Sequence, residues 1–182
     1  YYLHLGEISS YPPGYKENGS VFCHTNPWIM IAETRAGHGE RAFDYYLRIN
    51  PSAREEMSDI HRCEPYVYAQ MIAGKEALKP GEAKNSWLTG TAAWNYVAIS
   101  QWILGIRPAY DGLVIDPVIP AAWDGFSAVR QFRGKKLNIM VENPLHSGKG
   151  VTSVTINGTT ISDTLVPAGM LSANNQVIVR LG

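Results

Sequence analysis

Hydrophobic and polar positions follow two different periods, which change near Gly105. Before that residue, apolar side chains recur every three to four positions, as on helices that bury one face. After it, short segments alternate between apolar and polar residues, which is typical of half-buried strands. The pattern predicts an α+β chain with a helical part at residues 1–104 and a small antiparallel β domain at residues 105–182.

Four helices are predicted in the first part. Asn26-Pro27 is a favourable helix start, and Gly37 is a favourable stop. Further helices are expected over "ERAFDYYLRI", over "EPYVYAQMIAG" from Pro65 to Gly74, and over "LTGTAAWNYVAISQWILG". Their wide apolar stripes favour packing within a larger helical array.

Strands are predicted over most of the second part. The alternating segments are "AVRQFRG", "KLNIMVENP", "VTSVTING", "TTISDTLVP" and "QVIVRLG", and a short apolar run, "DGLVIDPVIP", precedes them. Asn157-Gly158 indicates a tight hairpin. This part shows no evident group of catalytic or ligand-binding residues. The segment "HSGKG" lacks the spacing of a phosphate-binding loop.

Charge and composition exclude several classes of partner. Lys plus Arg (16) equals Asp plus Glu (16), so nothing favours nucleic acid or an anionic membrane surface. No apolar run is long enough to span a bilayer, and the two cysteines do not form a disulfide scaffold. We expect a cytoplasmic protein. Because the chain starts without Met, at "YYLHLGEISSYPPG", we expect it to be a piece of a longer polypeptide.

An irregular, aromatic-rich stretch at Ser10–Trp28 carries several polar side chains. Irregular backbone on a rigid scaffold is often functional, although an ordinary surface loop is an equal alternative. Another candidate is Thr89-Gly90 at a helix entry, which suits an anion but also suits a capping threonine. A metal site is the weaker hypothesis, because no HExxH or CxxC spacing joins the candidate ligands His24, His38, His61, Cys23 and Cys63.

Several segments together resemble the C-terminal part of glycoside hydrolase family 94, the family of cellobiose phosphorylase. They are "YPPGYKENGSVFCHTNPW", "EPYVYAQMIAG", "KNSWLTGTAAWNY", "WILGIRPAYDGLVIDPVIP", "WDGF" and "RQFRG". The resemblance covers nearly the whole chain and is most specific from Tyr11 to Gly134. It implies the last helices of an (α/α)₆ barrel followed by a small antiparallel β-sandwich domain.

The resemblance also implies a reaction and site residues. The family cleaves a β-linked disaccharide with inorganic phosphate, inverts the anomeric centre and uses no cofactor, since phosphate is itself a substrate. The family's phosphate pocket matches His24, Thr89 and Gly90. Other family positions match Lys16 and Gln70 on the donor side of the sugar site and Glu7 and Tyr11 on its acceptor side, with Glu17 as a residue that orients Lys16.

The family's general acid, an aspartate, is expected upstream of this sequence, as are the arginines that share the phosphate. Asp44, Asp59, Asp111 and Asp116 do not occupy its motif, so we expect no catalytic acid here and no activity from this chain alone. The expected partners are the disaccharide, phosphate, the N-terminal part of the same bacterial enzyme and a second copy in a homodimer. The alternatives are a hydrolase with a similar barrel and a non-catalytic sugar-binding module.

Tyr11 bears on the choice of disaccharide. By resemblance, chitobiose-cleaving relatives carry a smaller residue there, and a bulky ring would crowd an N-acetyl group. The sequence therefore favours cellobiose, with N,N′-diacetylchitobiose, cellobionic acid and laminaribiose as the alternatives within the family.

Overall fold

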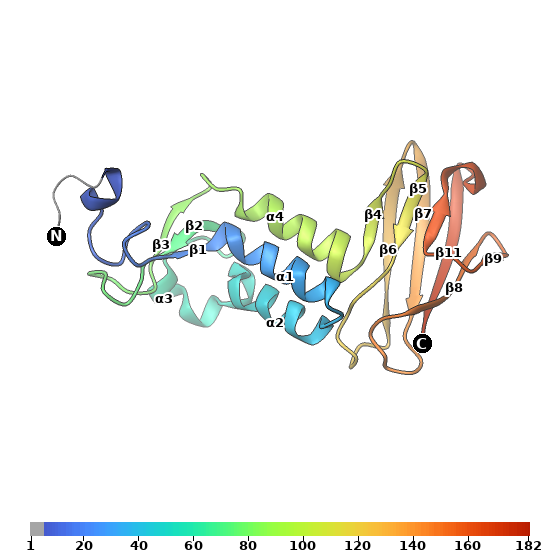
Figure 1. Cartoon of the computed structure of the whole chain (residues 1–182), viewed down its shortest axis with the longest axis horizontal. Coiled ribbons are helices and arrows are strands. Elements are labelled where there is room, and N and C mark those ends of the chain that lie inside the picture. The colour runs from blue at the N-terminus through green and yellow to red at the C-terminus, as the bar shows by residue number, and fades with distance from the viewer. Residues whose placement is uncertain (1–5) are drawn as a thin grey trace. The chain divides into compact units, whose positions relative to one another are not determined.

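The computed structural model describes residues 6–182 (Figure 1). The chain divides into two compact units. The first comprises Tyr1–Met30 and Asp44–Tyr96, and the second comprises Ile31–Phe43 and Val97–Gly182. The predicted domains at residues 1–104 and 105–182 stay a prediction.

Three of the four predicted helices are confirmed. α1 (Asn26–Arg35) stops before Gly37, whose φ of 79° is the left-handed conformation common at helix ends. α2 (Gly39–Ile49) follows. α4 (Thr91–Val97) continues directly as the π-helix η5 (Ala98–Ile103). The shorter helical segments are α3 (Ser58–His61), η1 (Glu7–Ser10), η2 (Cys23–Thr25), η3 (Pro51–Ala53), η4 (Glu55–Met57) and η6 (Ala168–Met170).

The helix predicted between Pro65 and Gly74 is wrong. This segment contains the strand β2 (Ala69–Ile72), which lies between β1 (Val21–Phe22) and β3 (Ala83–Ser86) in an antiparallel sheet. Hydrogen bonds to residues far away in the sequence decide its conformation, and local spacing does not reveal them. The sheet belongs entirely to the first unit.

The second unit contains two sheets. One has the order β10-β5-β4, and the other has the order β6-β7-β11-β8-β9. The strands of the first are β4 (Ile106–Pro108), β5 (Gly112–Ile115) and β10 (Leu165–Pro167). Those of the second are β6 (Gly125–Phe132), β7 (Lys135–Glu142), β8 (Val151–Ile156), β9 (Thr159–Ile161) and β11 (Asn174–Leu181).

The five-stranded sheet is mixed, which corrects the antiparallel domain that the sequence predicts. β11 pairs with β7 in parallel, while its other neighbour, β8, is antiparallel. Alternating burial identifies the inner face of a strand but says nothing of the direction of its partner. The hairpin at Asn157-Gly158 is confirmed, with φ values of 51° and 87° between β8 and β9.

The core of this sheet comes from alternate residues of its central strands. β7 and β11 each place every second side chain inside. Full burial of one such aliphatic side chain contributes roughly 1.5–3 kcal/mol. The buried residues are Leu137, Ile139, Val141, Val154, Ile156, Val177, Val179 and Leu181.

The helices and strands together confirm the α+β class. The (α/α)₆ barrel and the sandwich stay predictions.

Candidate functional site

Backbone contacts hold the loop at Ser10–Trp28 beside β2. The Gly74 N–H donates to the Gly14 carbonyl at 2.8 Å, and the Lys16 N–H donates to Met71 Sδ at 3.2 Å. Lys16 has a φ of 50°, which is uncommon for a residue other than glycine. These contacts fix the position from which the Lys16 side chain leaves the loop.

Lys16 and Gln70 lie 54 residues apart in the sequence but are in contact. Lys16 Nζ donates to Gln70 Oε1 at 3.2 Å. Asn85 Nδ2, on β3, donates to the same oxygen at 2.7 Å. The remaining N–H donors of the ammonium and amide groups suit the oxygen atoms of a sugar.

Glu7 and Tyr11 form a second contact pair in the first unit. Tyr11 Oη donates to Glu7 Oε1 at 2.8 Å. This hydrogen bond raises the pKa of Tyr11, and partial burial and the charges of Glu7 and Glu17 raise it further. Lys16 Nζ lies 6.0 Å from the centre of the Tyr11 ring. The four residues predicted to bind sugar thus form one cluster: Glu7, Tyr11, Lys16 and Gln70. Glu17 lies close to Tyr11. The prediction that Glu17 orients Lys16 stays a prediction.

An aromatic chain leads from His24 toward the entry of α4. His24 contacts Trp28 edge-on, with ring centres 6.2 Å apart, and Trp28 contacts Trp94 at 5.6 Å. A Cβ atom at Gly90 would lie 3.7 Å from Trp94 Cδ1. No hydrogen bond within residues 6–182 joins His24 to Thr89 or Gly90 directly, so their contact is indirect.

Thr89 caps α4, as the capping alternative predicts. Its Oγ1 accepts from the Thr91 N–H at 3.1 Å and lies 2.7 Å from Thr91 Oγ1. Thr91 is fully buried and donates to the Ala69 carbonyl at 3.0 Å. Because Ala69 precedes Gln70 on β2, Thr91 connects the predicted phosphate residues with the predicted sugar residues. A capped helix entry still presents other backbone N–H groups that an anion can accept.

Sequence reasoning missed Asn85 and Trp87 at the end of β3. Their φ values are 53° and 68°, and the Trp87 side chain is 66% exposed. Trp87 Nε1 lies 3.4 Å from Glu64 Oε1, and its ring lies 6.3 Å from that of Tyr66. Asparagine tolerates such backbone, which is a weak signal for Asn85, whereas nothing in the sequence predicts it for a tryptophan. Strained, exposed positions of this kind are frequent at ligand sites.

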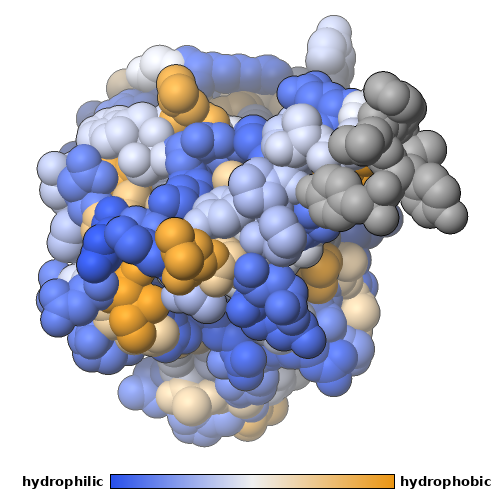
Figure 2. Space-filling view, turned by 90° about the vertical axis from the view of Figure 1, so that its left-hand side faces the viewer, coloured by the Kyte–Doolittle hydropathy of each residue, from blue (hydrophilic) through white to orange (hydrophobic). Residues whose placement is uncertain are grey.

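The face of the molecule that Figure 2 shows is mixed in polarity. In Figure 2, hydrophobic side chains stand in separate groups between polar ones. Such a surface can offer both hydrogen bonds and ring faces to a sugar. Exposed large apolar residues of the first unit include Ile8, Val21, Ile60, Tyr66, Trp87 and Leu88.

The metal-site candidates have other contacts or are buried. His38 Nδ1 bonds to Glu33 Oε2 at 2.7 Å, which lowers the pKa of Glu33. Burial raises the pKa of Cys23 to about 11 and lowers the pKa of His61. Residues 6–182 contain no group of three or more His, Cys, Asp or Glu side chains arranged to hold a metal ion.

Within the same residues, no helix has the length and apolar character required to cross a membrane.

The chain belongs to the glycosyl hydrolase 94 superfamily, because residues 1–105 match the catalytic domain of that superfamily. It is similar to phosphorylases of disaccharides. It is 42% identical over 178 residues to the N,N′-diacetylchitobiose phosphorylase of Vibrio proteolyticus, an alignment that covers 98% of this chain and 22% of that protein. It is 35% identical to the solabiose phosphorylase of Paenibacillus borealis, over 92% of this chain and 22% of the relative. The chain thus spans less than a quarter of the length of either relative.

Proposed function

We propose that the chain is part of an inverting disaccharide phosphorylase of the bacterial cytoplasm, acting as a homodimer. The observation that carries the proposal is the cluster of Glu7, Tyr11 and Lys16, from one short segment, with Gln70 of β2; these residues meet through hydrogen bonds and a cation–ring contact. The names of the relatives, which are phosphorylases of disaccharides, support the same reaction.

In this reaction an oxygen of inorganic phosphate attacks the anomeric carbon as the bond to the leaving sugar breaks. The leaving oxygen takes a proton from a general acid, which we expect upstream. Phosphate is already an anion, so no second carboxylate is needed to activate a water molecule, as it is in an inverting hydrolase. The protein must instead hold the phosphate in line with the breaking bond.

His24, Thr89 and Gly90 are proposed to hold that phosphate. A histidine can donate a hydrogen bond and, when protonated, supplies a positive charge. The helix entry supplies backbone N–H groups and the positive end of the helix dipole. The aromatic contacts through Trp28 and Trp94 support a fixed position of the imidazole relative to the helix entry.

Lys16 and Gln70 are proposed to hold the donor sugar, and Glu7 and Tyr11 the acceptor. The donors and acceptors of these side chains can bind the hydroxyl groups of a pyranose, and the tyrosine ring can cover its face. Two observations favour different acceptors. The bulk of Tyr11 favours glucose, and hence cellobiose as substrate. The names of two relatives, from Vibrio proteolyticus and Vibrio furnissii, favour N-acetylglucosamine, and hence N,N′-diacetylchitobiose.

Reverse synthesis tests the function and separates these acceptors. The chain is joined to the upstream residues of the Vibrio proteolyticus relative and incubated with glucose 1-phosphate or N-acetylglucosamine 1-phosphate. The acceptors are glucose, N-acetylglucosamine and gluconate, and phosphate release is measured. Release that requires one particular acceptor supports a phosphorylase. Cleavage of disaccharide to two free sugars without phosphate would instead identify a hydrolase, and binding without turnover would identify a sugar-binding module.

A further inference from the structure

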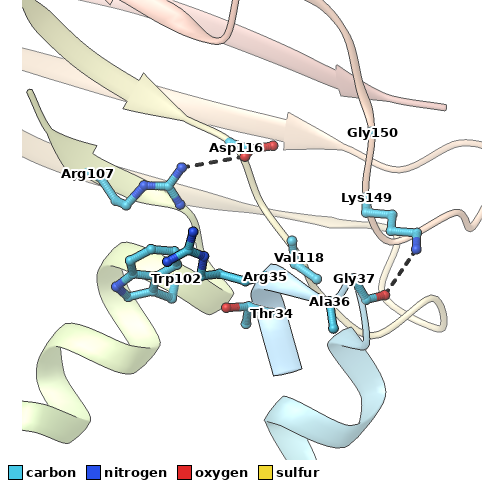
Figure 3. Close-up of a pocket in the computed structure, with 10 residues that line it drawn as sticks. All are labelled: Thr34, Arg35, Ala36, Gly37, Trp102, Arg107, Asp116, Val118, Lys149 and Gly150. Carbon is cyan, nitrogen blue, oxygen red and sulfur yellow. Dashed lines mark hydrogen bonds and ion pairs between the residues drawn. The ribbon is translucent and has the colours of Figure 1, made fainter. Parts of the chain in front are cut away.

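The second unit contains an open cavity of about 660 Å³ that is lined by three cationic side chains (Figure 3). Arg35 comes from the end of α1, Arg107 from β4 and Lys149 from the segment before β8. One carboxylate, Asp116, lines the same cavity. Its volume lies within the range of about 300–1,000 Å³ that is usual for small-molecule sites.

Arg107 is held in a fixed orientation at this cavity. Its guanidinium lies 4.7 Å from the centre of the Trp102 ring. Nη1 donates to the Gln101 carbonyl at 3.2 Å, and Nη2 lies 3.5 Å from Asp116 Oδ2 (Figure 3). Only 23% of the Arg107 side chain is exposed. A guanidinium held in this way loses little freedom when it binds an anion.

Arg35 approaches the same tryptophan from α1. Its guanidinium lies 5.9 Å from the Trp102 ring centre. Lys149 Nζ donates to the carbonyl of Gly37 at 3.2 Å, on the far side of the cavity in Figure 3. Neutralisation of the negative end of α1 accounts for Lys149 and partly for Arg35. It does not account for Arg107, which β4 brings to the same cavity.

The charges that line the cavity are unequal. Arg35, Arg107 and Lys149 carry three positive charges and Asp116 carries one negative charge, which leaves an excess of two. A phosphate monoester carries close to two negative charges at neutral pH, and its oxygen atoms match the fork of a guanidinium. A ligand with a single carboxylate group would neutralise only one of these two excess positive charges. The volume of the cavity also leaves space for the organic part of an ester.

We propose that this cavity binds a small phosphate monoester. The phosphate group is held by Arg35 and Arg107 beside Trp102, and Lys149 supplies the third positive charge. None of these residues belongs to the sets proposed for sugar and phosphate binding in phosphorolysis. The organic part of the ligand lies along the apolar wall made by Ala36 and Val118.

Nuclear magnetic resonance of the ¹⁵N-labelled 182-residue chain tests the proposal. The indole N–H signal of Trp102 is assigned with the variant Trp102→Phe. Glucose 1-phosphate and adenosine 5′-monophosphate are titrated separately, with inorganic phosphate and free glucose as comparisons. We expect saturable shifts of the Trp102 indole with at least one ester, weaker binding of inorganic phosphate and no shift with glucose. No shift with either ester, or equal binding of inorganic phosphate, would overturn the proposal.

Two variants test which residues hold the ester. Arg35→Gln removes an exposed cation and should weaken binding about tenfold. Arg180→Gln, on β11, removes a cation that is 60% exposed and outside the cavity, and should leave binding unchanged. The amide signals of β7 show whether each variant keeps its fold. Equal affinity for both variants would exclude Arg35 as a ligand-binding residue and contradict the proposal.

Discussion

Replacement of Thr91 by valine should disturb both the stability of the first unit and the proposed phosphate site. Thr91→Val keeps the shape of the side chain but removes the hydroxyl. That hydroxyl donates to the Ala69 carbonyl at 3.0 Å and lies 2.7 Å from Thr89 Oγ1. The substitution therefore removes the side-chain connection between the helix entry and β2.

The magnitude follows from the burial of this group. Thr91 is fully buried and Ala69 is 3% exposed, so water cannot replace the lost partner easily. Two lost hydrogen bonds at about 1 kcal/mol each give about 2 kcal/mol of lost stability, or about a thirtyfold change in the unfolding equilibrium. Because Thr89 then loses one of its contacts, the KM for phosphate should also rise several-fold while the KM for the disaccharide changes less.

Thr34→Val is the matched control. Thr34 is also buried, at 4% exposed, but among the described residues its hydroxyl donates only to the Ile31 carbonyl of the same helix, at 2.7 Å. Urea unfolding of the chain measures the stability of both variants, and phosphate titration of the enzyme that contains the chain measures the KM. Equal losses of stability and an unchanged phosphate KM for Thr91→Val would refute the positioning role of Thr91.

Three further predictions concern activity, substrate choice and pH. The 182-residue chain alone should release no sugar phosphate, because the general acid is expected upstream; chromatography of the products checks this. In the complete enzyme, Tyr11→Ala should raise the use of N-acetylglucosamine relative to glucose about tenfold, as measured in reverse synthesis. His61 Nε2 is buried without a hydrogen-bond partner in the described structure, and burial lowers its pKa below 6.5. Because the unfolded chain then binds the proton first, stability should fall as pH drops from about 7 to about 5. In urea unfolding, His61→Leu should lose less stability between these two pH values than the native sequence does. The control His146→Gln, at an exposed histidine, should lose as much stability as the native sequence.

Local signals predicted the elements that depend on local interactions. α1 begins at Asn26-Pro27 and ends before Gly37, as predicted. Asn26 is not the N-cap, however, because it has helical φ and ψ values (−61° and −40°) and its side chain donates to the Phe22 and Cys23 carbonyls. Asn157-Gly158 gives the hairpin between β8 and β9. The elements that depend on distant partners were missed: β2 was predicted as a helix, and the parallel pairing of β7 with β11 was not anticipated. Spacing along the chain carries no information about which distant strand supplies the hydrogen bonds.

The candidate site shows the same limit. Periodicity and composition marked the loop that contains Lys16 and the helix entry at Thr89, but they did not connect these residues with Gln70. That connection came from the family resemblance, and the contact between Lys16 and Gln70 is consistent with it. Asn85, within β3, and Trp87, directly after it, were not found, because spacing and composition do not reveal their left-handed backbone. No local preference predicts that conformation for a tryptophan.

The phosphate dependence of the complete enzyme tests the central claim most directly. Disaccharide cleavage is measured at increasing phosphate concentrations for the native sequence and for His24→Ala, with His146→Gln as control. We predict that sugar 1-phosphate forms only with phosphate. Loss of one charge-assisted contact in His24→Ala should cost about 2 kcal/mol, which raises the phosphate KM about thirtyfold and changes the disaccharide KM far less. Cleavage that does not depend on phosphate, or an unchanged phosphate KM in His24→Ala, would contradict the account.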